Sequence, residues 1–335
     1  MATINDVCRL AGVSKATVSR VINGSEQVKQ KTRDAVHEAM KELGYQPNVL
    51  AQALATNTSN SIGLILPHFY SHYFGTLLRQ AAQDIQQANK RLYVMDSHNG
   101  EDGELDAIRS LSTQRCDAII IYSRQLSEAK LLELQNEIKT PIVVLNRSLS
   151  AKGLHSLGFN QRQIASIAVQ HLIDLGHQHI ACITNPLTSD TGRDRLNAYK
   201  TCLHNNGLSF NPQLVMEGES DMDTGYKAVT QWIKDKTTFS AIFASNDDMA
   251  LGAIRALHDN GIKVPDDVSV VGIDNEPAAS YSIPSLSTVS LPIVQLTHEA
   301  VSIALQLANK VALTPSHNDF TGELITREST TALAN

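Results

Sequence analysis

The chain has 335 residues and a mass of 36.5 kDa, which predicts two or three domains rather than one. Hydrophobic residues make up 42% and charged residues 19%, so a sizeable core is expected and wholesale disorder is excluded. The net charge of −6 argues against a protein that coats nucleic acid along its whole surface. The charge is uneven, because residues 1–60 carry +2 and the remainder −8, and a mildly basic end can still bind DNA.

No apolar run approaches the ~20 residues that cross a bilayer, and the N-terminus lacks the apolar stretch of a signal peptide. We therefore expect a cytoplasmic protein with no membrane partner. The four cysteines are scattered without a CxxC pair, which predicts reduced thiols rather than disulfides or a zinc site. No metal and no cofactor is expected.

Three short helices are predicted in the first 50 residues. Thr3 is a candidate N-cap for a helix over 4–11, and Ser14 for one over 15–22. A third helix is expected over about 30–43. Its inward face should carry Ala35, Val36, Ala39, Met40 and Leu43. Together these helices form a compact head.

Residues 47–55 open with proline and continue with good helix formers, which predicts a helix that is marginal in isolation. A polar linker follows. Beyond it, apolar strand candidates alternate with helices such as 164–175 and 246–260, so two doubly wound parallel sheets are expected, although a TIM barrel is possible on length alone. The strand candidates are 62–66, 92–95, 118–122, 142–145, 180–184, 241–244 and 268–273.

Residues 11–24 place a glycine turn between two short helices, so the second helix could enter a major groove by its N-terminal end. Lys15 and Ala16 would then face base edges. The side chains suited to phosphates or nearby bases are Thr17, Ser19, Arg20 and Asn23. The alternative is a small helical bundle with ordinary solvated charges.

This segment resembles the lactose/galactose repressor family, especially its repressors of galactose and aryl-β-glucoside operons. The resemblance rests on residues 3–7, 13–21 and 43–48 and continues along the chain. It implies a small all-α helix-turn-helix head (1–46), a hinge helix with linker (47–60), and a two-lobed α/β body of the type I periplasmic-binding-protein fold (61–335). By the same resemblance, Thr3 and Ser14 join the DNA-binding residues.

The resemblance also makes residues 47–55 a hinge helix that folds in the minor groove when two subunits dock on DNA. Leu54 matches the leucine that wedges into the central base step, although a plain core residue is the alternative. Gln52 stands where many relatives have arginine, a change that would weaken a hinge contact.

In doubly wound sheets, ligands bind beyond the carboxyl ends of strands, and several polar residues follow predicted strands here. The resemblance places Asp274, Asn246 and Arg195 at effector-binding positions and expects other residues in the same cleft. These further candidates are His72, Phe74 and Arg147. One of Asn246 and Asp247 should also cap a helix. Phe159 and Ile273 replace more usual family residues, which leaves the effector open.

No GxGxxG, GxxxxGK[ST], HExxH or GxSxG motif occurs, so an enzyme is not expected. His68 and His72 have the spacing of metal ligands on a helix, but sugar contact or exposure is favoured. His177 and His179 should cap a strand or face solvent.

We therefore expect a homodimeric transcriptional repressor that binds a pseudo-palindromic operator and leaves it when a galactoside or β-glucoside effector binds. A purine-type corepressor-dependent regulator of the same fold is the alternative. A solute-binding protein of a transport system is a further alternative, but such a protein has only the two-lobed body and lacks the helical head. The chain ends without a leucine heptad, which favours a dimer over a coiled-coil tetramer. The sequence does not specify the effector, the operator or the regulated genes.

Overall fold

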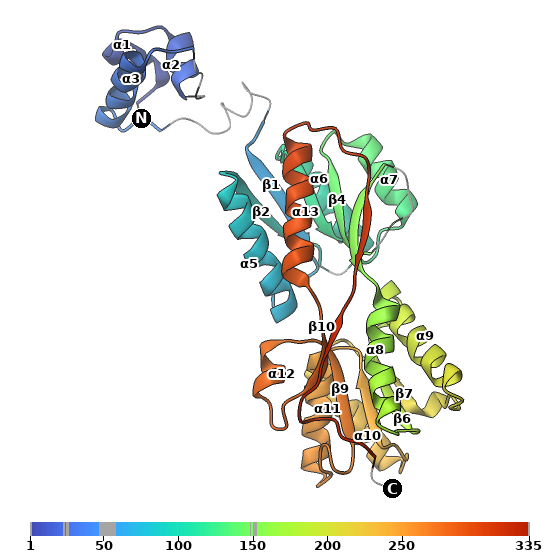
Figure 1. Cartoon of the computed structure of the whole chain (residues 1–335). Coiled ribbons are helices and arrows are strands. Elements are labelled where there is room, and N and C mark those ends of the chain that lie inside the picture. Colours follow the sequence, from blue (N-terminus) through green and yellow to red (C-terminus); the bar gives the residue numbers. More distant parts are fainter. Residues whose placement is uncertain are drawn as a thin grey trace.

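The computed structural model describes residues 2–22, 24, 27–46, 58–98, 100–147, 149 and 153–333. The expected hinge helix with Leu54, and also Asn23, lie outside these residues. Within the described part, a small helical head precedes a body of two lobes (Figure 1). No helix there is long and apolar enough to cross a membrane.

The head consists of the predicted helices α1 (Ile4–Ala11), α2 (Lys15–Ile22) and α3 (Gln30–Glu42). The Asp6 carboxylate accepts hydrogen bonds from the Thr3 backbone N–H (2.8 Å) and hydroxyl (2.7 Å), which fixes the start of α1. Gly12 ends α1 at φ 64°, a conformation that favours glycine. Ala35 is exposed, contrary to its predicted inward position, because the buried face of α3 is the narrower stripe of Val36 and Ala39.

The upper lobe contains a parallel six-stranded sheet of order β11-β5-β4-β3-β1-β2. Its strands are β1 (Ser61–Leu66), β2 (Arg91–Asp96), β3 (Ala118–Tyr122), β4 (Ile142–Asn146), β5 (His155–Phe159) and β11 (His317–Phe320). Alternate strand residues pack against α5 and α13 on one face and against α6 and α7 on the other. These helices are α5 (His72–Gln87), α6 (Glu101–Thr113), α7 (Glu128–Glu137) and α13 (Ile293–Ala308).

The lower lobe contains a second six-stranded sheet, of order β12-β10-β9-β8-β6-β7, in which only β12 is antiparallel among the described pairs. Its strands are β6 (Ile180–Thr184), β7 (Val215–Glu217), β8 (Ala241–Ala244), β9 (Ser269–Asp274), β10 (Ser287–Ser290) and β12 (Glu323–Ile325). Its helices are α8 (Gln161–Asp174), α9 (Asp190–Asn205), α10 (Met222–Lys234), α11 (Asp247–Asp259) and α12 (Pro277–Tyr281), with a 3₁₀ turn at Pro212–Leu214.

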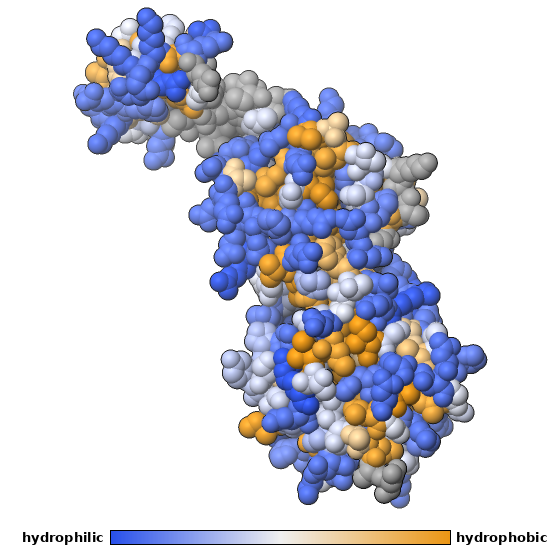
Figure 2. Space-filling model, in the orientation of Figure 1, coloured by the Kyte–Doolittle hydropathy of each residue, from blue (hydrophilic) through white to orange (hydrophobic). Residues whose placement is uncertain are grey.

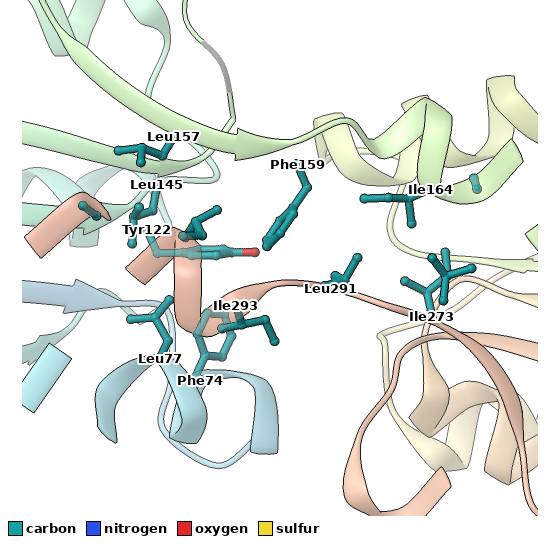
Figure 3. Close-up of a cluster of buried hydrophobic side chains, with 14 of the residues drawn as sticks. Phe74, Leu77, Tyr122, Leu145, Leu157, Phe159, Ile164, Ile273, Leu291 and Ile293 are labelled. Carbon is teal, nitrogen blue, oxygen red and sulfur yellow. The ribbon is translucent and has the colours of Figure 1, made fainter. Parts of the chain in front are cut away.

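The chain passes between the lobes three times, from β5 to α8, from β10 to α13 and from β11 to β12. Phe159 lies at the first crossing, and Leu291 and Ile293 lie at the second; all three are buried in one apolar cluster that extends into both lobes (Figure 3). The two lobes are therefore joined by a continuous core at the crossings. Two doubly wound sheets rather than a TIM barrel account for the length, as expected.

Candidate functional site

The polar face of α2 is available for contact. Val18 and Val21 are buried against the other head helices, and this orientation leaves Lys15, Ala16 and Arg20 exposed on the opposite side. On the face drawn in Figure 2, the head is mostly hydrophilic.

The start of α2 is held by its cap. The Thr17 backbone N–H donates to the Ser14 hydroxyl at 3.2 Å, and the two hydroxyl oxygens are 2.9 Å apart. Thr17 and Ser19 are half-buried, and Thr3 is exposed at the start of α1. The head therefore presents a short helix by its N-terminal end, as groove insertion requires.

Two cavities lie where the lobes meet. The first, of about 240 Å³, is lined by residues of the upper lobe such as His72 and Tyr73 and of the lower lobe such as Asp274 and Glu276. The second, of about 410 Å³, is lined by Arg147 of the upper lobe and Asp190 of the lower lobe among others.

Arg195 and Asp274 of the lower lobe interact electrostatically close to these cavities. Arg195 is 4% exposed, donates to the Gln161 side-chain oxygen at 2.8 Å and also donates to the Ser245 carbonyl. Gln161 lines the second cavity and Asp274 the first. Burial raises the pKa of Asp274 well above its usual range, while the positive charge of Arg195 opposes that rise. Arg195 thus contacts Gln161 at the second cavity and interacts electrostatically with Asp274 at the first.

Two tyrosines of the upper lobe face this pair. Tyr122 ends β3 and Tyr73 lies in the first turn of α5, with ring centroids 6.0 Å apart. Burial raises the pKa of both hydroxyls, and Asp274 and Arg195 act electrostatically on each. Side chains of both lobes therefore share one desolvated polar cluster. Tyr122 was not predicted, although its place at the carboxyl end of a strand is the signal that selected the other candidates.

Phe74 and His72 occupy different surroundings, although they are neighbours in α5. Phe74 is 3% exposed and packs edge-on against Tyr122, with ring centroids 4.8 Å apart, so it belongs to the core beneath the cleft. His72 is exposed at the rim of the smaller cavity, and its ring nitrogen lies 3.3 Å from the Thr76 hydroxyl. His68 lies before α5 and His72 is the first residue of α5, so the two histidines do not share a helix.

Arg147 bridges the lobes. One guanidinium nitrogen lies 3.4 Å from the Asp190 carboxylate at the start of α9, and another donates to the Leu126 carbonyl. The Arg147 side chain is 16% exposed, and its buried Nε has no partner in the described part of the chain. Because both residues line the second cavity, this ion pair joins the two lobes across it.

Asn246 caps α11, as expected. Its side-chain oxygen accepts from the Met249 N–H at 2.9 Å, and its amide donates to the Ser220 carbonyl at 2.8 Å. Asp247 is structural, since its carboxylate accepts from the Thr288 hydroxyl at 2.6 Å and from the Glu276 N–H at 2.8 Å. Burial raises the pKa of Asp247 to about 7.

The prediction for His177 is wrong. Its ring is 2% exposed, with one nitrogen 3.0 Å from the Ser240 hydroxyl and the other 3.1 Å from the Thr331 carbonyl. These partners come from distant segments of the chain, so local sequence gave no sign of them. His179, by contrast, is exposed, as expected.

Residues 3–48 match the bacterial regulatory proteins of the lacI family, and residues 169–330 match a periplasmic binding protein-like domain. The chain is similar to the HTH-type transcriptional regulator AscG of Escherichia coli (strain K12), with 38% identity over 98% of each protein. It is also similar to the lac repressor dimer bound to operator and the anti-inducer ONPF, with a TM-score of 0.89, 30% identity and 99% of each chain covered. A sugar-binding lacI-family regulator from Escherichia coli, complexed with phosphate, matches with a TM-score of 0.75 and 34% identity over 82% of this chain and all of that one.

Proposed function

This chain belongs to the lacI family of bacterial regulatory proteins, and from that premise we propose that it is a homodimeric repressor released from a pseudo-palindromic operator by a sugar. The observation that carries the proposal is the presence, in one chain, of a head with an exposed polar helix and a body with polar groups of both lobes around a cleft. The sugar is of the galactoside or β-glucoside type. The similarity to a sugar-binding relative supports this class of effector.

In the head, Lys15 and Ala16 contact base edges, and Arg20 contacts a phosphate. Thr3, Ser14, Thr17 and Ser19 complete the DNA-contacting set. The exposure of α2 and the similarity to an operator-bound relative support these roles. Contacts by Asn23 and wedging by Leu54 stay predictions from the sequence.

In the body, the effector contacts Asp274 and Arg195, with His72, Arg147 and Asn246 around them and Phe74 beneath. Because these groups belong to both lobes, a ligand between them binds one lobe arrangement better than another. Differential affinity of this kind shifts the population, and coupling of about 1–3 kcal/mol changes operator affinity about 5- to 150-fold.

A second copy of the chain is expected to cover apolar side chains that remain exposed on the body. Tyr281 and Ile283 near α12 are 86% and 95% exposed, and Tyr93 on the edge strand β2 is 39% exposed. Large exposed apolar residues are typical of association surfaces. The two-fold symmetry of a dimer then requires two operator half-sites.

The test starts by selecting operator sites from a random DNA pool with the full-length protein. Release of the selected DNA is then measured with galactose, β-glucosides, cellobiose and purines. A sugar should release the DNA and, at about 100 times its Kd, add about 2.7 kcal/mol of stability. A variant carrying Lys15→Ala and Arg20→Ala should lose DNA binding but keep stabilisation by the sugar. A purine that strengthened DNA binding, with no response to sugars, would replace this proposal by the corepressor alternative.

A further inference from the structure

Arg124 has a free guanidinium at the carboxyl end of β3. The guanidinium carbon lies 5.5 Å from the ring centre of Phe74 and 5.5 Å from that of Tyr122. Among the residues that the structure describes, no carboxylate lies within ion-pair distance of it. Arg147, at the same interlobe junction, differs in this respect because it pairs with Asp190.

The loop that carries Arg124 is fixed by a different anion. The Glu104 side chain is 2% exposed and accepts from the Ser123 hydroxyl (2.7 Å) and from three successive backbone N–H groups. These belong to Arg124 (2.7 Å), Gln125 (3.1 Å) and Leu126 (3.2 Å). The backbone thus satisfies the buried carboxylate, and the Arg124 side chain is left for another partner while its loop is held in place.

The surroundings of Arg124 place it at the proposed effector site. The ring of Tyr122, beneath the guanidinium, lies 6.0 Å from that of Tyr73, which lines the smaller interlobe cavity. His68 packs edge-on against Phe74, with centroids 4.6 Å apart, and its buried Nδ1 has no partner within the described residues. A guanidinium resting on aromatic rings keeps its in-plane N–H donors available for a two-oxygen anion.

We propose that Arg124 is an anion-binding subsite of the interlobe cleft, so that the effector is a sugar that carries a phosphate ester or a carboxylate. Phosphate and carboxylate present the same pair of oxygens to the guanidinium. The inference rests on the proposed function of the cleft as the effector site. It adds that a neutral sugar binds more weakly than its anionic derivative.

The experiment measures Kd by calorimetry for the full-length protein with matched sets of sugars. Each set contains a neutral sugar, its 6-phosphate and its uronate, namely glucose and galactose with their derivatives. An anionic derivative should bind at least about tenfold more tightly than its neutral parent, as expected for a charge-assisted hydrogen-bonded pair. The 6-phosphate and uronate arms identify which anion is recognised.

Arg124→Gln should reduce that preference to about twofold or less. Arg124→Lys should retain part of it, because lysine keeps the positive charge but lacks the paired N–H donors of the guanidinium. Arg109→Gln is the matched control, since Arg109 lies on α6 in an exposed pair with Glu137 and should leave the preference intact. Thermal unfolding without ligand checks that each variant is folded.

Equal binding of neutral and anionic sugars, or a preference that survives Arg124→Gln, would overturn the anion subsite while leaving a sugar-responsive repressor in place. Binding of purines with no sugar bound at all would instead overturn the proposed function, and this inference with it.

Discussion

Replacing Glu104 by glutamine should destabilise the upper lobe strongly. The amide oxygen can still accept from the Arg124 and Gln125 N–H groups, but the amide nitrogen then faces the donor positions of Ser123 and Leu126. The Ser123 hydroxyl can rotate to accept, whereas the Leu126 N–H cannot. One unsatisfied buried donor costs about 1–3 kcal/mol, and loss of charge assistance in the remaining bonds adds to it, so about 3 kcal/mol is expected.

Thermal unfolding of the full-length protein measures this loss. A loss of about 3 kcal/mol corresponds to a fall of about 6–12 °C in the unfolding midpoint for a lobe of this size. Glu101→Gln removes the same charge from the exposed first turn of α6, and should change stability by less than about 0.5 kcal/mol. Equal midpoints for the two variants would refute the idea that Glu104 holds the loop of Arg124.

Three further outcomes are expected. Arg20→Ala should weaken operator binding. If Arg20 contacts one phosphate, the slope of the log binding constant against log salt concentration should become shallower by about one unit. An unchanged slope in titrations at several salt concentrations would exclude that contact. Asp274→Asn should leave operator affinity intact but weaken the effector about tenfold or more in a release assay, and normal release would exclude Asp274 from the site. Burial raises the pKa of both Asp247 and Glu276 to about 7, above the unfolded values of 3.8 and 4.5. The folded state then binds more protons between about pH 4 and 7, so stability falls as pH rises through this window, and Asp247→Asn should flatten the midpoint–pH curve.

Local pattern was enough for much of the fold. Apolar runs such as 118–122 and 180–184 identified the buried strands, because parallel strands covered on both faces are apolar throughout. Short strands such as β10 (Ser287–Ser290) and β11 (His317–Phe320) were not predicted from the sequence, because they are polar and only four residues long. Their pairing comes from neighbours in the sheet rather than from their own composition.

The site residues, too, were predictable from the sequence only in part. The position of Asp274 and Asn246 after strands followed from sequence, because parallel strands bring their carboxyl ends to one edge of a sheet. The strand-end rule also selects Arg124, which lies two residues beyond β3. The local sequence did not show that the backbone N–H of Arg124, rather than its guanidinium, would donate to a buried carboxylate. That fact depends on Glu104, which lies on a different element.

The sequence by itself therefore determined the head helices, the two-lobed α/β body and the strand-end residues, since these follow from periodicities and caps within a few residues. Only the tertiary structure decided which polar groups are paired and which are free. Arg147 meets Asp190 from 43 residues away and His177 meets Thr331 from 154 residues away. Such pairings are decided by the packing of whole lobes, because a buried polar group takes whatever partner the fold brings within hydrogen-bond distance.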